Sequence, residues 1–211
     1  MSTKSPRIQT FLDRVGDRVR NLRRARDWTV QQLADESSLS RRMLTQIELG
    51  QANPSLATID RIAHALDANF ADLALRGKAS SRPDSSASCD RGQRTSADPG
   101  GTGQPDPGSG HTLAWEGPHE STAHLLGASS APGTELWRWH LGPGVRYQAE
   151  PDRAGTEEIL HVISGELALE LPDETQTLSA GMSTNTPTDQ SYSYTAGQEA
   201  PVDFIRVVIG A

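Results

Sequence analysis

The sequence has little cysteine, few aromatic residues and no long apolar run, and each shortage excludes something. Its one cysteine, Cys89, cannot form an internal disulfide, which favours a reducing compartment. No apolar run approaches the roughly 20 residues that a membrane-spanning helix needs. Residues 1–9 are polar and lack the apolar core of a secretory signal. We therefore expect a cytoplasmic protein with no membrane partner.

Motifs for catalysis and for cofactors are also scarce. Cys89 lies in a low-complexity stretch of small polar residues, which is a poor setting for a nucleophile. No strand precedes Gly100, Gly101 and Gly103, so these glycines do not form a phosphate-binding loop. The sequence therefore predicts a protein that is not an enzyme and that carries no cofactor.

Charge is divided unevenly along the chain. Residues 1–78 contain 13 of the 20 Lys and Arg residues and 9 of the 27 Asp and Glu residues. Residues 79–211 contain the other 7 basic and 18 acidic residues. The balance is therefore +4 in the first part and −11 in the second. A basic part beside an acidic part suggests that only the first contacts a polyanion such as nucleic acid.

Hydrophobic spacing and composition divide the chain into three segments. Residues 10–77 have apolar side chains at steps of three and four, which predicts helices. Residues 78–110 are mostly Ser, Gly, Pro, Asp and Thr and have little to bury, which predicts a disordered linker. Residues 111–211 alternate apolar and polar side chains between turn signals, which predicts the short strands of a sandwich or barrel.

Helix start and stop signals subdivide the first segment. Thr29 with Gln32 three residues later forms a capping box, and Ser40 can cap the helix that follows. Gly50 can end that helix because glycine accepts the left-handed backbone of a C-terminal cap. The Asn-Pro-Ser run at 53–55 then opens a fourth helix.

These signals lie in the stretch 28–55, which resembles the lambda-repressor-like, or XRE-type, helix-turn-helix family. The resemblance extends over residues 11–75, and Leu49 departs from it because many members have a polar or basic residue there. The resemblance implies an N-terminal five-helix lambda-repressor-like bundle that binds double-stranded DNA. Its recognition helix would begin near Ser40 and enter the major groove.

Arginine and glutamine on that helix suit the reading of bases. Arg forms paired hydrogen bonds with guanine, and Gln does the same with adenine. The family resemblance adds phosphate contacts near helix N-termini. An arginine pair on a surface helix is often no more than a solvated face, so the assignment depends on the whole motif. The predicted DNA-binding residues are Gln31, Ser40, Arg41, Arg42, Thr45, Gln46 and Asn53.

The other charged residues of this segment have either DNA-binding or structural roles. The arginines at 20, 23, 24 and 26 either attract phosphate or only solubilise the first helix. Glu48 would be repelled by DNA, so we expect it to pair with an arginine of the first helix.

The third segment resembles the cupin family, which implies a small β-barrel of the double-sheet jelly-roll type and places a dimer contact in the barrels. The residues that match its two motifs are Gly144, Glu150, Pro151, Asp152, Glu158 and Gly165, then Gly181, Pro187 and Tyr192. Coverage extends over residues 111–211, so the resemblance completes a two-domain α + β protein.

The metal-binding positions of the cupin motif are altered. Metal-binding members present His-x-His, one Glu and a final His, whereas this chain has Glu150, Asp152 and Tyr192 at the histidine positions. Transition metals favour imidazole nitrogen, so no such metal is expected. The three carboxylates, including Glu158, could instead hold a harder ion or form a cluster with a raised pKa. His161 should point to the opposite face from Glu158, since strand side chains alternate.

A small barrel can hold one small ligand. The side chains that could line such a pocket are Arg138, Tyr147, Glu158, Tyr192 and Tyr194. Tyr192 and Glu158 could equally fill and hydrogen-bond the core.

These features together predict a sequence-specific transcriptional regulator, a homodimer whose cupin-like domain responds to a small-molecule effector. The alternatives are an antitoxin that binds a toxin, a cupin enzyme tethered to DNA and a structural DNA-binding protein with an inert barrel.

Overall fold

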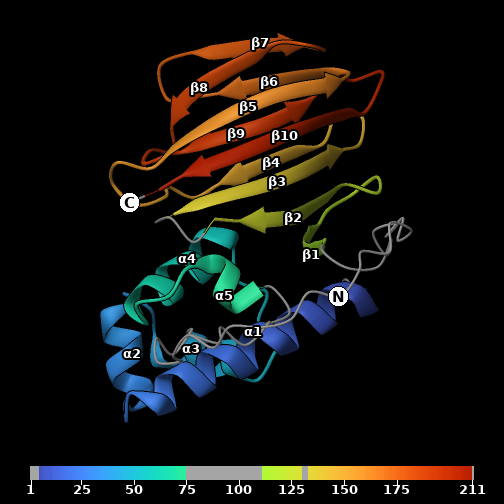
Figure 1. Cartoon of the computed structure of the whole chain (residues 1–211). Helices are drawn as coiled ribbons and strands as arrows, with labels where there is room; N and C mark the ends of the chain where they lie inside the picture. Colours follow the sequence, from blue (N-terminus) through green and yellow to red (C-terminus); the bar gives the residue numbers. More distant parts are fainter. Residues whose placement is uncertain (1–4, 75–110, 130–132, 211) are drawn as a thin grey trace, which may run out of the picture. The chain divides into compact units, whose positions relative to one another are not determined.

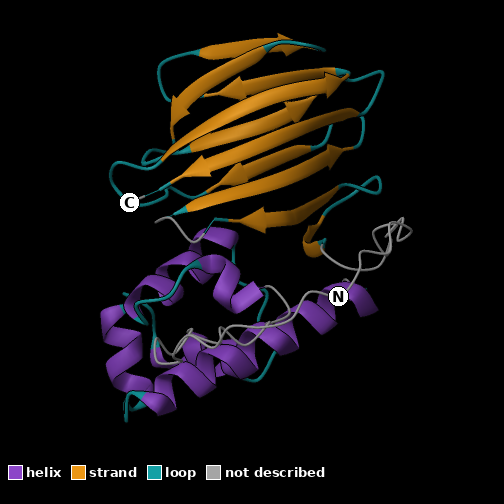
Figure 2. Ribbon diagram, viewed as in Figure 1, coloured by secondary structure: helices purple, strands orange, loops and turns teal. Residues whose placement is uncertain are grey.

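A computed structural model describes residues 5–74, 111–129 and 133–210 as a helical domain followed by a domain of strands (Figures 1 and 2). The predicted linker, 78–110, lies outside the described residues. No helix among the described residues is long and apolar enough to cross a membrane.

The helical domain contains the predicted five helices within the described residues. They are α1 (Pro6–Ala25), α2 (Val30–Glu36), α3 (Arg41–Glu48), α4 (Leu56–Ala65) and α5 (Phe70–Ala74). The first helix begins at Pro6 rather than near residue 10. Proline is favoured in the first turn because its missing N–H needs no partner there, and Ser5 caps the helix by accepting from the Ile8 N–H.

The predicted helix boundaries inside the domain are confirmed. Thr29 and Gln32 form both halves of a capping box at the start of α2. The Ser40 and Ser55 side chains accept backbone N–H bonds at the starts of α3 and α4. Gly50 follows α3 with a φ of 67°, in the left-handed region where glycine is not strained.

The core of the helical domain forms where α1 crosses the short helices. Val15 and Val19 of α1 are buried together with Leu33 of α2 and Leu44 of α3. Gly16 lies where the backbones approach most closely, because a Cβ there would meet the Ile47 carbonyl oxygen at 2.5 Å. The absent side chain lets α1 rest directly on the end of α3, which fixes the orientation of that helix.

The second domain is built from ten described strands in two antiparallel sheets. The strands are β1 (Thr112–Glu116), β2 (Thr122–Ala128), β3 (Thr134–Leu141), β4 (Arg146–Ala149), β5 (Glu157–Ser164), β6 (Glu166–Glu170), β7 (Thr175–Ser179), β8 (Ser183–Pro187), β9 (Tyr192–Ala196) and β10 (Val202–Ile209). One sheet has the order β1-β2-β3-β10-β5-β8 and the other β4-β9-β6-β7. The predicted double-sheet jelly roll is confirmed, although the described ladders do not join into one closed barrel.

Alternation along the strands fills the space between the two sheets with aromatic rings. Trp139 of β3 stacks on Phe204 of β10 with ring centres 5.9 Å apart. Tyr194 of β9 lies edge-on to Phe204 at 5.2 Å, and Tyr147 of β4 lies 4.6 Å from Trp139. Aromatic pairs of this kind stabilise a core beyond their buried area. The burial patterns of β3 and β10 confirm the alternation predicted for this part of the chain.

Candidate DNA-binding surface and the interior of the jelly roll

Helix α3 presents one polar face to solvent. Leu44 and Ile47 are buried beneath it, whereas Arg41 and Arg42 are exposed in the first turn. Thr45 and Gln46 follow one turn later on the same face, and both are half-buried. The structure therefore brings four of the predicted DNA-binding residues together on a single helix surface, just beyond the Ser40 cap.

The remaining two predicted DNA-binding residues flank this face in the sequence. Gln31 is exposed in the first turn of α2, where its amide donates to the Asp35 carboxylate at 2.7 Å. Asn53 is exposed in the connection between α3 and α4, two residues before the Ser55 cap. Both therefore lie near helix N-termini, where unpaired backbone N–H groups favour phosphate.

A buried ion pair holds α3 against α1. The Arg23 guanidinium donates to both oxygens of Glu48, through Nε at 2.6 Å and through Nη2 at 3.0 Å. Its third nitrogen donates to the Trp28 carbonyl at 2.7 Å, which also ties in the start of α2. The hydrogen bond to Glu48 raises the pKa of Arg23, and the nearby carboxylate charge adds to that effect. The predicted pairing of Glu48 with an arginine of the first helix is confirmed.

The other arginines of α1 divide between structural and solvent-facing positions. Arg20 donates to the backbone carbonyl of Glu48, which caps the end of α3. Arg26 pairs with Asp67 at 3.3 Å on the surface, and Arg24 is exposed. Arg20 and Arg23 therefore hold the end of α3, and of the four arginines only Arg24 is exposed.

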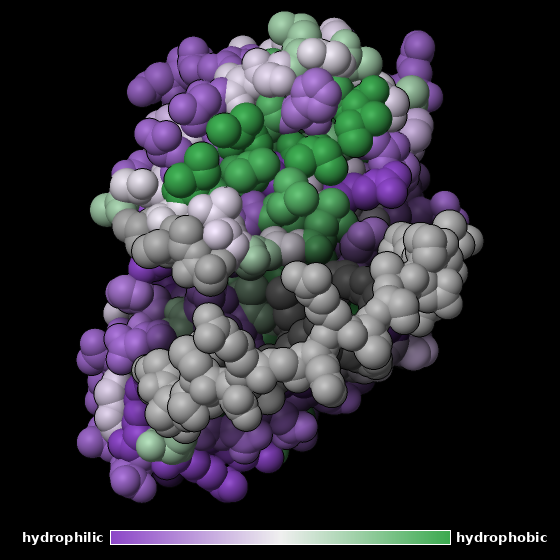
Figure 3. Space-filling view, in the orientation of Figure 1, coloured by the Kyte–Doolittle hydropathy of each residue, from purple (hydrophilic) through white to green (hydrophobic). Residues whose placement is uncertain are grey.

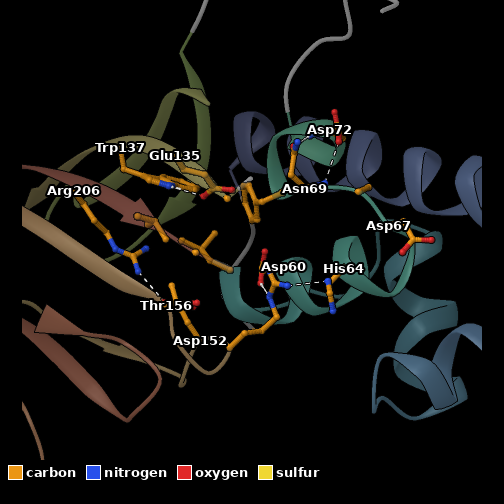
Figure 4. A pocket seen from close by; sticks show the side chains of 17 residues that line it. Asp60, His64, Asp67, Asn69, Asp72, Glu135, Trp137, Asp152, Thr156 and Arg206 are labelled. Atoms are coloured by element: carbon orange, nitrogen blue, oxygen red, sulfur yellow. Dashed lines mark hydrogen bonds and ion pairs between the residues drawn. The ribbon is translucent and has the colours of Figure 1, made fainter. Parts of the chain in front are cut away.

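The interior of the jelly roll contains a buried charge network centred on Arg206 of β10. Its Nε donates to Glu158 of β5 at 2.6 Å, and its Nη2 donates to Asp152 at 3.1 Å. Nη2 also contacts the Tyr192 hydroxyl at 2.7 Å, and the Tyr194 hydroxyl donates to Glu158 at 2.5 Å. Figure 4 shows the guanidinium pointing toward Asp152.

Burial sets the protonation of this network. It raises the pKa of Glu158, and the Arg206 charge and the Tyr194 hydrogen bond oppose that rise. Burial also raises the pKa values of Tyr192 and Tyr194 well above their ordinary range, so both phenols stay protonated. Burial alone would lower the pKa of Arg206, but the groups around it raise the pKa well above its usual value.

The structure brings together four of the five predicted pocket residues. Tyr147, Glu158, Tyr192 and Tyr194 all point into the space between the sheets, and the Tyr147 and Tyr194 ring centres are 6.1 Å apart. Arg138 instead lies on the outer face of β3, beside Asp203 at 3.6 Å, because it alternates with the inward-facing tryptophans.

Arg206 is the member of the network that the pocket prediction missed. It follows Phe204 and precedes Val208 by two residues each, so all three point to the same face of β10. That parity predicts an inward-facing arginine, and a buried arginine needs acidic partners. The alternation of side chains along β10 could therefore have predicted the inward-facing position of Arg206.

The donor set does not fit the metal ion that the cupin resemblance would bring. Asp152 and Glu158 both bind Arg206, and Glu150 is exposed. His161 faces outward as predicted and contacts the Ser183 hydroxyl at 2.9 Å. Residues 5–74, 111–129 and 133–210 contain no group of three acidic, histidine or cysteine side chains arranged to hold a metal.

Comparison with known protein families defines the class of the helical domain. Residues 19–73 match the model of the HTH_3 helix-turn-helix family, a range that runs from the last turns of α1 through α2, α3 and α4 into α5. The N-terminal domain is therefore an XRE-type helix-turn-helix domain. The C-terminal domain is a double-sheet jelly roll by the order of its strands.

Several proteins to which the chain is similar are named as regulators or as a repressor. The chain is 27% identical over 193 residues to the HTH-type transcriptional regulator SutR of Escherichia coli K12, covering 90% of this chain and 91% of SutR. It is 44% identical over 52 residues to the immunity repressor protein of Bacillus phage phi105, where the match spans 36% of the repressor. The crystal structure of an HTH_3 family transcriptional regulator from Vibrio cholerae shares the fold, with a TM-score of 0.65, 20% identity and coverage of 97% and 99% of the two chains.

Proposed function

We propose that this chain is a transcriptional regulator that binds specific double-stranded DNA through α3. The observation that carries the proposal is the exposed face with Arg41, Arg42 and Gln46, on a helix whose orientation is fixed by Arg23 and Glu48. Its relatives named as regulators and as a repressor support the same conclusion.

Selection of binding sites from random duplexes by the full-length protein tests this function. A consensus should emerge, and Arg42→Ala should lose about 1–3 kcal/mol of binding free energy at one base pair of it. Arg24→Ala, at an exposed position of α1, is the matched control and should leave the preference for that base unchanged. An equal loss on every duplex would make Arg42 a phosphate contact, and the absence of any consensus would contradict the proposal.

We further propose that two copies associate through the outer face of the six-stranded sheet. Figure 3 shows an apolar surface there, and its exposed members are Leu136, Ile159, Ile163 and Ile209, with exposures between 40% and 51%. Val207 of β10 lies directly between Leu136 and Ile159 in the ladder, so the apolar surface is continuous over three strands. Exposed apolar surface of this kind commonly marks a protein interface.

Two charges at opposite corners of that surface suit a second copy of the same chain. Arg138 lies beside Ile205 on one side of β10, and Glu157 lies beside Ile209 on the other side. A two-fold axis in the plane of contact, along the other diagonal, sets each Arg138 opposite the partner's Glu157. An interface of this symmetry is self-complementary, which is the usual requirement for a homodimer.

Charge reversal tests the proposed dimer. The molar mass of the full-length protein is measured by light scattering as it elutes from a size-exclusion column. Arg138→Glu alone and Glu157→Arg alone should each weaken the dimer, and the double variant should restore it. Glu166→Arg, on the other sheet, is the control and should have no effect. A monomeric parent protein, or a double variant no better than the two single ones, would contradict this interface.

We place the proposed small-molecule effector beside Arg138. A groove of about 320 Å³ there is lined by this arginine with His111, His124, His140 and Asp203. Several cationic or imidazole donors face one carboxylate, which suits a small anion. An effector changes DNA affinity only if it binds the two states of the protein differently. Small carboxylates and phosphates should therefore change the DNA affinity of the parent protein but not that of His124→Ala. An equal change in the DNA affinity of both proteins would contradict the site.

A further inference from the structure

The Arg206 guanidinium contacts the side chains at most of the positions that correspond to cupin metal ligands. Those positions are Glu150, Asp152, Glu158 and Tyr192 in this chain. Arg206 donates to Glu158 at 2.6 Å and to Asp152 at 3.1 Å, and it contacts the Tyr192 hydroxyl at 2.7 Å. Three of the four positions therefore converge on one cation that is part of the chain.

The contacts of Arg206 supply a counter-charge to two buried carboxylates. Asp152 and Glu158 point at the same buried volume, where ionised carboxylates without a counter-charge are strongly unfavourable. A guanidinium is suited to this position because it stays charged when buried and spreads its donors in a plane. Nε and Nη2 of Arg206 reach two carboxylates that come from different parts of the sequence.

We propose that Arg206 takes the place of a metal ion, so that the jelly roll is completed by a covalently attached cation. The guanidinium then joins β10 to β5 through Glu158, to β9 through Tyr192, and to the segment before β5 through Asp152. Each of these connections is a polar contact beside the aromatic and aliphatic side chains of the core.

Removal of the Arg206 guanidinium should leave a vacant, negatively charged site inside the jelly roll. Arg206→Ala would leave Asp152 and Glu158 facing an unfilled space. Glu158 would then keep the hydrogen bond from Tyr194 but lose its counter-charge, and its Oε1 atom has no hydrogen-bond partner within the described ranges. Two carboxylates and a phenol around such a space form a site for a free guanidinium ion or for a hard divalent cation that prefers oxygen.

Thermal unfolding of the full-length Arg206→Ala variant tests this prediction. Its midpoint should fall below that of the parent protein, and low-millimolar guanidinium chloride should raise it saturably, whereas sodium chloride at equal concentration should not. Arg146→Ala removes an exposed arginine that pairs with Glu170 at 2.8 Å and is the matched control. The parent protein and this control should show no stabilisation by guanidinium. A variant as stable as the parent protein, or one that guanidinium never stabilises, would overturn the proposal.

A second measurement tests whether the parent protein needs a metal ion to fold, and it does not depend on the folding of Arg206→Ala. The parent protein is unfolded in urea with a chelator, refolded with the chelator still present, and followed by tryptophan fluorescence. Full recovery of the native signal, with less than stoichiometric metal by elemental analysis, is the expected result. Recovery that requires added metal, or stoichiometric metal that survives the chelator, would overturn the proposal.

Discussion

Arg23 of α1 holds Glu48 at the end of α3 through two hydrogen bonds, of 2.6 and 3.0 Å, inside the helical domain. Glu48 lies two residues beyond the half-buried Gln46, so the pair fixes the orientation of the face of α3 that we propose binds DNA. Breaking a buried pair leaves an uncompensated charge, which is more costly than losing a surface ion pair.

Arg23→Ala should therefore lower the free energy of unfolding of the helical domain by about 3 kcal/mol, as measured by urea denaturation followed by circular dichroism. The exposed Arg24→Ala should change it by less than about 0.5 kcal/mol. Equal effects of the two variants would show that the Glu48 pair does not stabilise the domain.

Gly16→Ala should disturb the same junction without changing any charge. The added Cβ would lie 2.5 Å from the Ile47 carbonyl oxygen, so α1 and α3 would have to separate. We expect a loss of about 1–3 kcal/mol in stability and weaker DNA binding in an electrophoretic mobility assay. Gly127→Ala, which meets no atom within 4 Å, is the control for glycine replacement, and a Gly16 variant that behaves like it would contradict the close contact.

Tyr194→Phe should destabilise the jelly roll by about 1–3 kcal/mol, because the buried Glu158 carboxylate loses a hydrogen bond of 2.5 Å. Tyr147→Phe is the matched control, because the hydrogen bonds that Glu158 accepts from described residues come from Tyr194 and Arg206. Denaturant unfolding followed by tryptophan fluorescence measures both variants. A smaller loss for Tyr194→Phe than for Tyr147→Phe would be inconsistent with the hydrogen bond.

His124 should make stability fall in mild acid. Burial lowers its pKa, and the nearby His111 and Arg138 charges lower it further. The unfolded chain, in which a histidine titrates near about 6.5, therefore binds more protons as the pH falls through that value, and the free energy of unfolding decreases. Urea titrations across this range should show the decrease, and His124→Gln should reduce it. A variant that loses stability in acid as much as the parent protein would contradict the assignment.

The helical domain was largely predictable because its signals are local. Thr29, Ser40 and Gly50 each specify a helix end through contacts within four residues, and those ends place Arg41 and Arg42 on the exposed face. The position of Gly16 was not predicted, because the crossing of α1 over α3 depends on packing between residues that are distant in sequence.

The interior of the jelly roll was less predictable. Strand alternation correctly placed Glu158 and His161 on opposite faces, and the same rule puts Arg138 outside. Which inward-facing residues meet depends on the order of strands, and β10 pairs with β5 across about fifty residues of sequence. The partnership of Arg206 with Glu158 therefore required the structure.

Strand β10 follows every other described strand in the chain, yet it lies between β3 and β5 in the middle of the six-stranded sheet (Figure 1). During synthesis on the ribosome, β3 and β5 emerge first and keep unpaired edges until β10 has been made. Those edges are open to aggregation in the interval. A stop codon before residue 202 should therefore yield insoluble protein, even though the helical domain has long been complete.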